Sequence, residues 1–395
     1  MSPTRRRLLQ QSARFWRRVR DHDPTVHYFH QVDDPYSHLA IQTLERLQQR
    51  YRVGFRYHLV PRADDAYLGD AKRYPIWSLH DAEDIASYYG LDFPRDAERP
   101  SIDQVMRANR RLADQYASSR FPEIALDVGQ QLWSGQTIDT YHLASEEDAE
   151  MVLEKENKIR GRWGHYLGAM FYFEGEWYWG VDRLCRLETR LIEEGFSNEH
   201  DAELCVPRPQ PVDAAPLDAS HVLLEYFPSL RSPYTAISFR RTMQLVKRTG
   251  VQLELKPVLP MMMRGVPAPR AKAIYILNDT RREAEAEGEP FGKMVDPFGE
   301  PVRLAFSLYP WARDAGKGAA YLQSYLDAAF ADGIDISSEA GLKQVVERID
   351  LPWDEAKTHL GNDGWQAELE SNVQAMNRAG LWGVPSFRVS GGNKP

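Results

Sequence analysis

The sequence predicts an α/β protein made of two tandem, similarly built domains, each interrupted by a block of helices. Two observations lead to this prediction. A short motif ending in Pro-Tyr occurs twice, and its copies at Asp34 and Ser232 stand 198 residues apart (232 − 34). Each copy also occupies the same place in a pattern of strand, helix and strand. At 395 residues the chain is long enough for two domains with separate hydrophobic cores.

The repeated motif joins a short apolar run to a turn and then to a helix. Its first copy lies at residues 27–36 and its second at residues 225–234. Proline is favoured in the first turn of a helix, where its missing N–H would have had no acceptor within the helix. The copies differ at the residue before the proline, which is Asp34 in one and Ser232 in the other. That position is where a helix cap or a reactive group would stand.

A βαβ unit is expected around each motif. Residues 53–57 and 251–255 alternate apolar and polar side chains, as a half-buried strand does. A helical pattern precedes each of them, at residues 36–51 and 234–249. A strand, a helix and a second strand in this order predict a parallel pair with a right-handed crossover.

Each half continues with a block of helices and a closing strand. We expect helices at residues 102–117, 122–133, 146–162, 302–315, 319–332, 338–348 and 365–379. Closing strands are expected at 167–173 and 382–388, and alignment through Asn157 and Asn372 sets Met170 against Pro385. The first half then adds a strand at 177–179. The second half, as given, reads without that last strand and without a closing helix.

These elements predict four segments. They are a basic N-terminal helix at residues 1–23, a first domain at 24–197, a proline-rich linker at 198–220 and a second domain at 221–395. The N-terminal helix is expected to be amphipathic, with Leu8, Leu9 and Phe15 facing the body of the protein.

Composition and charge exclude several classes of protein. A net charge of −8 argues against general nucleic-acid binding, and no apolar run is long enough to span a membrane. The two cysteines, Cys185 and Cys205, form no Cys-x-x-Cys motif, which excludes a disulfide scaffold and a cysteine-based zinc site. A reducing compartment, the cytoplasm, is the simplest expectation. The scattered residues His27, His30 and His38 are interpreted as surface or core histidines, so no metal is expected.

The ordered features of the second half carry a resemblance to a known family. They are Ser232-Pro233-Tyr234, the helix and strand after it, the helical block, and Gly383-Val384-Pro385-Ser386-Phe387. Together they resemble the DsbA-like thioredoxin-fold family, and within it the branch of 2-hydroxychromene-2-carboxylate isomerases and kappa-class glutathione transferases. The resemblance extends more weakly over the first half, so that the chain resembles a tandem of two such domains.

The resemblance implies a glutathione site in the second domain. Ser232 would steady the glutathione thiolate without attacking it. Val384, before a cis Pro385, would hold the peptide part of the ligand through its backbone. Lys272 would pair with a carboxylate, and Tyr234 would face the cleft.

Each of these residues also has a purely structural interpretation. Ser232 could serve only as a helix N-cap worth about 1 kcal/mol. Lys272 and Arg264, the second candidate for a carboxylate, could be ordinary solvated cations. Tyr234 could belong to the aromatic core, and the run at residues 261–263, Met-Met-Met, could line a substrate cleft or pack in the core.

The first domain departs from the family at the decisive positions. Asp34 replaces the serine, and a carboxylate would repel a thiolate. Met170 replaces the proline. We therefore expect the first domain to lack the family's chemistry, although Gly180, Asp182 and Arg183 match residues that help to bind glutathione in the family.

The predicted function is a glutathione-dependent isomerase or transferase that acts on a small aromatic or electrophilic molecule. The alternative is a non-catalytic tandem protein that binds a ligand or a protein partner. Disulfide exchange is disfavoured because it needs an attacking and a resolving thiol. By analogy with the family, the two halves are expected to pair as an intrachain pseudo-dimer, and the chain could also form a homodimer.

Overall fold

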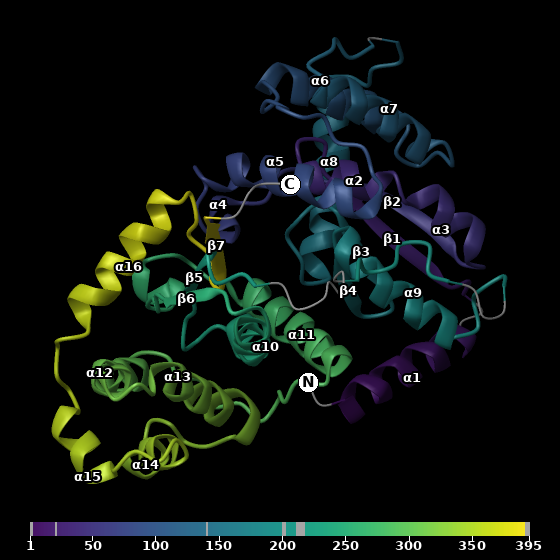
Figure 1. The fold of residues 1–395 in the computed structure, drawn as a ribbon. Helices are drawn as coiled ribbons and strands as arrows, with labels where there is room; N and C mark the ends of the chain where they lie inside the picture. Colours follow the sequence, from purple (N-terminus) through teal and green to yellow (C-terminus); the bar gives the residue numbers. More distant parts are fainter. Residues whose placement is uncertain (1–2, 20–21, 140, 200–202, 211–217, 392–395) are drawn as a thin grey trace. The chain divides into compact units, whose positions relative to one another are not determined.

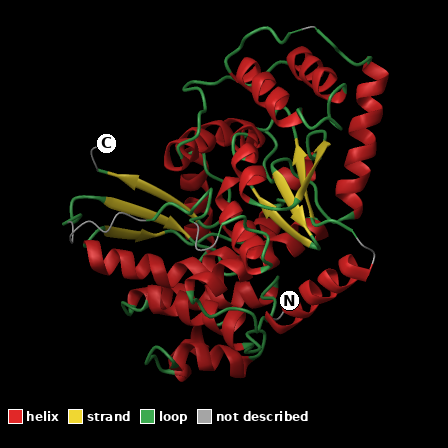
Figure 2. Ribbon diagram, turned by 90° about the vertical axis from the view of Figure 1, so that its right-hand side faces the viewer, coloured by secondary structure: helices red, strands yellow, loops and turns green. Residues whose placement is uncertain are grey.

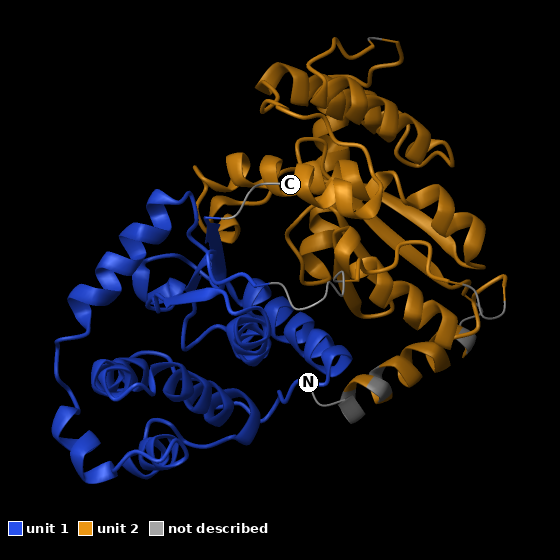
Figure 3. Cartoon of the chain, viewed as in Figure 1, with its two compact units in different colours: residues 1, 212–395 blue, residues 2–211 orange. Residues whose placement is uncertain are grey.

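The protein is an α/β chain that divides into two compact units. The computed structural model describes residues 3–19, 22–139, 141–199, 203–210 and 218–391 (Figure 1). The N-terminal unit comprises residues 2–211, and the C-terminal unit comprises residues 212–395 together with residue 1 (Figure 3). Each unit contains one β-sheet with helices around it (Figure 2).

The sheet of the N-terminal unit has the strand order β2-β1-β3-β4. Its strands are β1 (Thr25–His30), β2 (Gly54–Leu59), β3 (Met170–Phe173) and β4 (Glu176–Trp179). The pair β1–β2 is parallel, whereas β3 runs antiparallel to both β1 and β4. Val26 and Tyr28 are fully buried in the main core of this unit, which fixes the face that β1 turns toward it.

The helices of the N-terminal unit begin where the sequence offers caps. They are α1 (Pro3–Val19), α2 (Pro35–Ile41), α3 (Leu44–Arg50), α4 (Asp65–Leu68), α5 (Tyr74–Tyr89), α6 (Ile102–Ala113), α7 (Phe121–Trp133), α8 (Glu146–Arg162), the short 3₁₀ helix η1 (Val181–Arg183) and α9 (Leu184–Glu193). Ser101 forms a capping box with Gln104 at the start of α6. Ser145 caps α8 by accepting the Asp148 N–H.

The sheet of the C-terminal unit has the order β6-β5-β7. Its strands are β5 (Leu223–Phe227), β6 (Gln252–Leu255) and β7 (Ser386–Ser390). As in the first sheet, the central strand is parallel to one neighbour and antiparallel to the other. The helical segments are α10 (Pro233–Thr249), η2 (Met261–Arg264), α11 (Arg270–Glu287), α12 (Glu300–Asp314), α13 (Gly318–Asp327), the π-helical η3 (Ala328–Asp332), α14 (Glu339–Glu347), α15 (Trp353–Ala356), η4 (Lys357–His359) and α16 (Gln366–Arg378).

The predicted crossover helix at 36–51 is divided in the structure into α2 and α3. Thr43 lies at the break, and its side-chain Oγ1 donates a hydrogen bond to the Ala40 carbonyl at 2.7 Å. A threonine hydroxyl that bonds a preceding carbonyl competes with the helical pattern and bends the chain. In the C-terminal unit the corresponding helix, α10, continues unbroken to Thr249 and is closed by Gly250 in the left-handed conformation.

The outer edge of β7 has no strand partner in the described part of the chain. Phe387 and Val389 on this strand are 42% and 64% exposed. In the N-terminal unit β4 occupies the corresponding side of β3. The C-terminal sheet therefore ends one strand earlier than the N-terminal sheet within the described residues.

The N-terminal helix α1 presents the opposite face from the one expected. Leu8 and Phe15 are 59% and 60% exposed, and the side chain of Leu9 lies outside the described residues. Arg14 and Arg17 face the unit instead, because acidic side chains there attract them: Arg14 pairs with Glu194 at 3.1 Å, and Arg17 pairs with Glu174.

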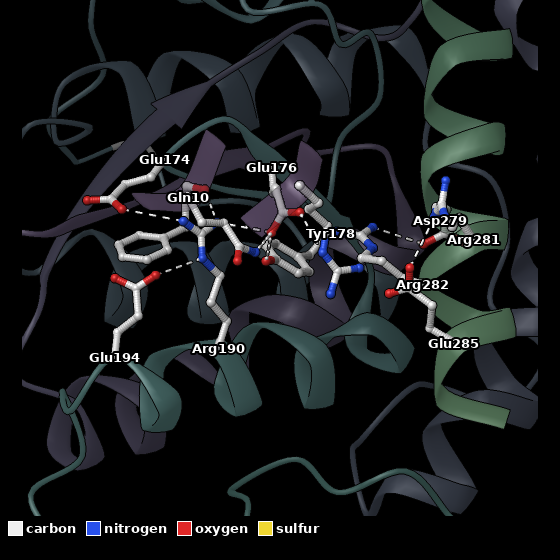
Figure 4. A network of polar contacts seen from close by, with 12 residues as sticks. Gln10, Glu174, Glu176, Tyr178, Arg190, Glu194, Asp279, Arg281, Arg282 and Glu285 are labelled. Atoms are coloured by element: carbon white, nitrogen blue, oxygen red, sulfur yellow. Dashed lines mark hydrogen bonds and ion pairs between the residues drawn. The ribbon is translucent and has the colours of Figure 1, made fainter. Parts of the chain in front are cut away.

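Arg190 of α9 organises these acidic residues. Its guanidinium donates to Glu194 at 3.0 Å and to Glu176 at 3.1 Å, and Gln10 of α1 reaches Glu176 as well, as the labelled side chains in Figure 4 show. This network of charge-assisted hydrogen bonds holds α1 within the N-terminal unit. None of the described helices is both long and apolar enough to cross a membrane.

Candidate functional site

Ser232 is the N-cap of α10 and links that helix to the loop before β7. Its Oγ accepts the Thr235 N–H at 3.2 Å and donates to the Val384 carbonyl at 3.1 Å. The residue is 7% exposed. One hydroxyl therefore ties the start of the helix to the backbone that precedes Pro385.

The Val384–Pro385 peptide bond is cis, as the resemblance implied. The Val384 side chain packs against a small cluster that includes Phe227, Val258 and Met376. Its carbonyl is taken by Ser232, whereas its N–H has no acceptor among the described residues. Val384 and Pro385 are both half-buried.

Arg264 has a structural role that the sequence did not indicate. Its Nε donates to the Leu259 carbonyl at 2.9 Å and its Nη2 donates to the Trp382 carbonyl at 3.0 Å. Burial lowers the pKa of Arg264 to about 10. The guanidinium thus connects the segment after β6 to the loop that carries Val384, and two of its nitrogens are engaged there.

Tyr234 is anchored through its hydroxyl, which donates to Asp279 Oδ2 of α11 at 2.8 Å. Asp279 is 1% exposed and also pairs with Arg282 at 3.0 Å. The same contact occurs 198 residues earlier, where the Tyr36 hydroxyl donates to Asp81 of α5 at 2.7 Å. Tyr234 therefore joins two helices, and its hydroxyl is engaged in that contact.

Lys272 lies in the first turn of α11 and is half-buried. Desolvation lowers the pKa of its ammonium group. The negative charge of an anionic ligand beside it would raise this pKa. Nearby in the sequence, the residues Met261–Arg264 form the 3₁₀ helix η2, where Met262 is 40% exposed and Met263 packs against the main core of this unit.

The surroundings of Ser232 limit its chemistry. Among the described residues, both hydrogen-bond partners of its hydroxyl are backbone groups, and no described histidine, carboxylate or amine is bonded to it as an activating base. The sequence has no cysteine after Cys205, so the C-terminal unit has no thiol for disulfide exchange. The arrangement suits a donor that steadies a bound group without attacking it.

The N-terminal unit places Asp34 where the C-terminal unit has Ser232. Asp34 caps α2, and its Oδ2 accepts the Ser37 N–H at 3.0 Å and the Ser37 Oγ–H at 2.7 Å. Burial raises the pKa of this carboxyl to about 7. The Ser37 Oγ in turn accepts the Ala169 N–H at 2.8 Å, which ties the cap to the segment before β3.

The strand registers correct one expected correspondence. Phe29 pairs with Met170, and Phe227, which lies 198 residues after Phe29, pairs with Ser386. The counterpart of Pro385 is therefore Ala169 and not Met170, because the alignment through the asparagines was displaced by one residue. Ala169 has a φ of 51°, a left-handed conformation that is uncommon outside glycine.

The segment Gly180–Arg183 contacts the same region. The Gly180 N–H donates to the Ala169 carbonyl at 2.9 Å, and Asp182 forms an ion pair with Arg183 at 2.5 Å. Gly180 has a φ of 66°, which glycine adopts without strain. In this structure these residues support the loop before β3.

A pocket opens beside Asp34, in the unit that the sequence marked as lacking a site. It encloses about 520 Å³ including its open mouth. Its walls include Tyr74, Ser78, Arg99, Trp133, Gly168 and Trp179. These residues come from separate segments, and no motif or spacing in the sequence connects them. Among the described residues no group of three or more histidine, cysteine, aspartate or glutamate side chains could hold a metal ion.

Comparison with known protein families finds a match to part of the chain. Residues 223–394 match the family described as the DSBA-like thioredoxin domain. None of the curated proteins matches the chain.

Several solved structures resemble part of the chain. A 2-hydroxychromene-2-carboxylate isomerase is 17% identical, with a TM-score of 0.37, over 42% of this chain and 84% of its own. The cytosolic disulfide reductase DsbM from Pseudomonas aeruginosa is 23% identical, with a TM-score of 0.35, over 42% of this chain and 87% of its own. A structure of DsbM with GSH gives 21% identity, a TM-score of 0.33, and coverage of 42% and 88%.

Proposed function

We propose, from the DSBA-like thioredoxin domain at residues 223–394, that the C-terminal unit binds glutathione and uses its thiolate in the isomerisation or conjugation of a small aromatic or electrophilic molecule. One observation carries the proposal. The Ser232 hydroxyl accepts an N–H at the N-terminus of α10 and donates to the backbone before Pro385, so a single hydroxyl contacts both elements that would hold the ligand.

Each part of glutathione has a partner of suitable chemistry. The N-terminus of a helix favours negative charge, and a thiolate there could replace the Val384 carbonyl as acceptor for the Ser232 hydroxyl. The Val384 N–H can donate to a peptide carbonyl of the ligand. Lys272 can pair with a carboxylate, which would offset the desolvation that now lowers the pKa of this lysine.

The proposed activity needs no nucleophile from the protein. The thiol of glutathione supplies the nucleophile, and Ser232 stabilises its ionised form. This agrees with the backbone partners of the Ser232 hydroxyl among the described residues and with a sequence that has no cysteine after Cys205. As part of the same proposal, the protein works in the reducing cytoplasm, and the two units arose by duplication of one domain.

Calorimetric titration with glutathione and with S-methylglutathione tests the role of Ser232. The methyl derivative keeps the peptide but cannot form a thiolate. Ser232→Ala is expected to weaken glutathione binding roughly tenfold or more, as loss of a hydrogen bond to a charged group does, and to leave S-methylglutathione binding nearly unchanged.

Ser338→Ala is the matched control for this substitution. Ser338 is another N-cap serine of the same unit and accepts the Gly341 N–H at 3.0 Å. Ser338→Ala should leave the binding of both ligands unchanged. Turnover of 1-chloro-2,4-dinitrobenzene with glutathione, reduced in Ser232→Ala and retained in Ser338→Ala, would support catalysis. Failure of the native protein to bind glutathione at millimolar concentration contradicts the proposal.

A second candidate function is a non-catalytic ligand- or protein-binding domain. It is favoured by the surroundings of Ser232. This residue is only 7% exposed, and its hydroxyl already has both a hydrogen-bond donor and an acceptor within the protein. If glutathione and S-methylglutathione bind equally and Ser232→Ala changes neither, this candidate is preferred.

A further inference from the structure

We propose that the N-terminal unit contains a second ligand site, the pocket beside Asp34, and that this pocket binds a small organic acid. The proposal concerns residues between Gln31 and Trp179 only and does not depend on the site at Ser232. The pocket will be called the Asp34 pocket.

The Asp34 pocket has the walls of a small-molecule site. The space at the pocket, open solvent at its mouth included, is about 520 Å³. Tyr74, Trp133 and Trp179 provide aromatic surface, and Leu79 and Leu167 provide aliphatic surface. A flat apolar ligand body would gain contact with these side chains.

Three hydrogen-bond donors of the pocket lack acceptors among the described residues. Trp133 is 3% exposed, and its indole N–H has no partner. The Tyr74 hydroxyl forms no hydrogen bond with a described residue, and Arg99, exposed at the rim, pairs with no described carboxylate. Buried donors are nearly always satisfied in proteins, so an unpartnered one in a pocket indicates a ligand that brings an acceptor. A carboxylate provides two acceptor oxygens.

Arg62 also lines the pocket but differs from Arg99, because it already pairs with Asp65 at 2.8 Å. Among the described cations that line this pocket, Arg99 is therefore the one available to a ligand. It gives the site a preference for a negatively charged group over a neutral amide of the same shape.

Asp34 lies in the wall of the pocket and controls whether an acid can enter. Gly168 approaches it so closely that an added Cβ would stand 2.9 Å from Asp34 Oδ2. Burial holds the pKa of Asp34 near 7. A protonated Asp34 can donate a hydrogen bond to the ligand, whereas an ionised Asp34 repels a carboxylate. Binding of an acid is therefore coupled to proton uptake.

The groups around Asp34 set the direction of this coupling. Asp33 raises the pKa of Asp34 by repulsion, and Ser37 lowers it through hydrogen bonds. Tyr28, Tyr36 and Tyr74 also sense the charge of Asp34, and each has its own pKa raised by burial and by that charge.

A buried cation is the remaining charged neighbour of Asp34. Arg160 is 2% exposed, and the negative charge of Asp34 raises its pKa while burial lowers it to about 10. Arg160 forms no ion pair with Asp34. Its positive charge favours an anion in this part of the unit, in agreement with an acid as ligand.

The loop that closes the pocket is held in an unusual conformation. Ala169 follows the lining residue Gly168 and adopts a φ of 51° while fully buried. Positive φ at a non-glycine residue is maintained only where the surroundings impose it, and such residues cluster at ligand sites. This supports the assignment of the pocket independently of its charges.

Calorimetric titration with benzoate and its uncharged analogue benzamide tests the proposal in the full-length protein. Benzoate is expected to bind, and its affinity should fall up to about tenfold for each pH unit above about pH 7, as Asp34 ionises. Benzamide should bind more weakly and without this pH dependence. Asp34→Asn should abolish the pH dependence while benzoate still binds.

Control variants separate the pocket from general effects. Asp64→Asn makes the same change at the exposed N-cap of α4, where Asp64 accepts the Ala66 N–H, and should leave binding unchanged. Trp133→Phe and the surface change Arg99→Gln should each weaken benzoate binding several-fold. If Asp34→Asn does not fold, Arg99→Gln and the pH profile of the native protein still decide.

Three results would overturn the proposal. They are the absence of benzoate binding at millimolar concentration, equal binding of benzoate and benzamide at all pH values, and benzoate binding that neither Arg99→Gln nor Trp133→Phe weakens. A pH dependence that persists in a folded Asp34→Asn protein would likewise remove Asp34 from the site.

Discussion

At the scale of single residues, the two units solve the same capping problem with different chemistry. Ser232 and Asp34 both precede a Pro-Tyr pair and both accept a backbone N–H at the start of a helix. The serine hydroxyl is neutral at every pH of interest and can also donate, which it does to Val384. The buried carboxyl only accepts when ionised, so its capping bonds compete with the free energy of burying a charge.

Asp34 is expected to make the stability of the N-terminal unit fall as pH rises. Its pKa is raised in the folded state to about 7, so the folded protein holds this proton over a pH range in which the unfolded chain has lost it. The penalty is absent below about pH 4 and complete above about pH 7, where it is on the order of 4 kcal/mol at most. Asp34→Asn keeps the helix cap and should remove this penalty.

Denaturant unfolding of the native protein and of Asp34→Asn at several pH values measures this effect. The variant should gain stability relative to the native protein as pH rises. Equal stability differences at about pH 5 and about pH 8 would show that Asp34 ionises normally in the folded protein.

Ser232→Ala is expected to destabilise the C-terminal unit by about 1–2 kcal/mol, because it removes a helix cap and leaves the Val384 carbonyl without a donor. Chemical denaturation measures the change. Ser338→Ala removes a cap together with an exposed hydrogen bond to the Asp335 carbonyl, and it should have a smaller effect because that carbonyl stays accessible to water. A larger loss in Ser338→Ala than in Ser232→Ala would contradict this prediction.

The Pro-Tyr pair at a helix start indicated the cap at Ser232, and the resemblance to the family implied the cis bond at Pro385. The sequence did not predict that Arg264 holds the Trp382 carbonyl or that Tyr234 reaches Asp279. Those contacts depend on where elements distant in the sequence meet. The expected alignment of Met170 with Pro385 was wrong by one residue for the same reason, since strand register is set by pairing across the sheet.

At the scale of elements, a tyrosine–aspartate hydrogen bond joins two helices in each unit. Tyr36 links α2 to α5, and Tyr234 links α10 to α11, over the same sequence separation of 45 residues. In both cases the acceptor carboxylate belongs to the first long helix after the second strand of the sheet. The contact fixes how the long connection after that strand returns to the site.

Tyr234→Phe is expected to loosen α11, because it leaves the buried Asp279 carboxylate with one donor fewer, at a cost of about 1–3 kcal/mol. Hydrogen–deuterium exchange should show faster exchange at residues 270–287. Tyr36→Phe, the matched change in the other unit, should instead affect residues 74–89. Exchange that rises equally in both helices in either variant would contradict the assignment.

Gly341→Ala is expected to destabilise the C-terminal unit strongly. An added Cβ in α14 would lie 2.0 Å from the Asp335 carbonyl oxygen, so the backbone would have to move, at a cost of roughly 3 kcal/mol or more. Gly161→Ala in α8 meets nothing within 4 Å and should be neutral or stabilising by up to about 1 kcal/mol. Thermal unfolding of both variants measures the difference, and equal effects would refute it.

Helix positions were predictable where caps and periodicity agree, and α8 begins and ends at the expected residues, Glu146 and Arg162. The orientation of α1 was not predictable. An amphipathic pattern identifies two faces of a helix, but it does not show which face the acidic residues elsewhere in the unit will attract. The division of α2 from α3 at Thr43 was not predicted either.

At the scale of the whole molecule, acid is expected to open the N-terminal unit before the C-terminal unit. Burial lowers the pKa of His27 and His30 to about 3 and that of His38 to about 4, and it also lowers the pKa of His165. All four belong to the N-terminal unit. A histidine with a depressed pKa destabilises the fold as pH falls below about 6.5, where the unfolded chain takes up protons first.

The destabilisation from four histidines is larger than the stability gained by protonating Asp34 alone. The free energy of unfolding should therefore fall by a few kcal/mol by about pH 4.5. Limited proteolysis or hydrogen exchange at about pH 5 should report opening within residues 22–199 while residues 218–391 stay protected. The prediction is wrong if the C-terminal unit opens first, or if neither unit responds to acid.

The unpaired outer edge of β7 has a consequence for handling and storage of the protein. Its backbone N–H and C=O groups can template another strand, and the exposed Phe387 and Val389 offer apolar side chains to such a strand. Concentrated solutions are therefore expected to self-associate through this edge, slowly and increasingly with warming, as partial opening frees more chain. Val389→Lys would place a charge in the growing contact and should reduce this self-association, which light scattering of concentrated samples measures.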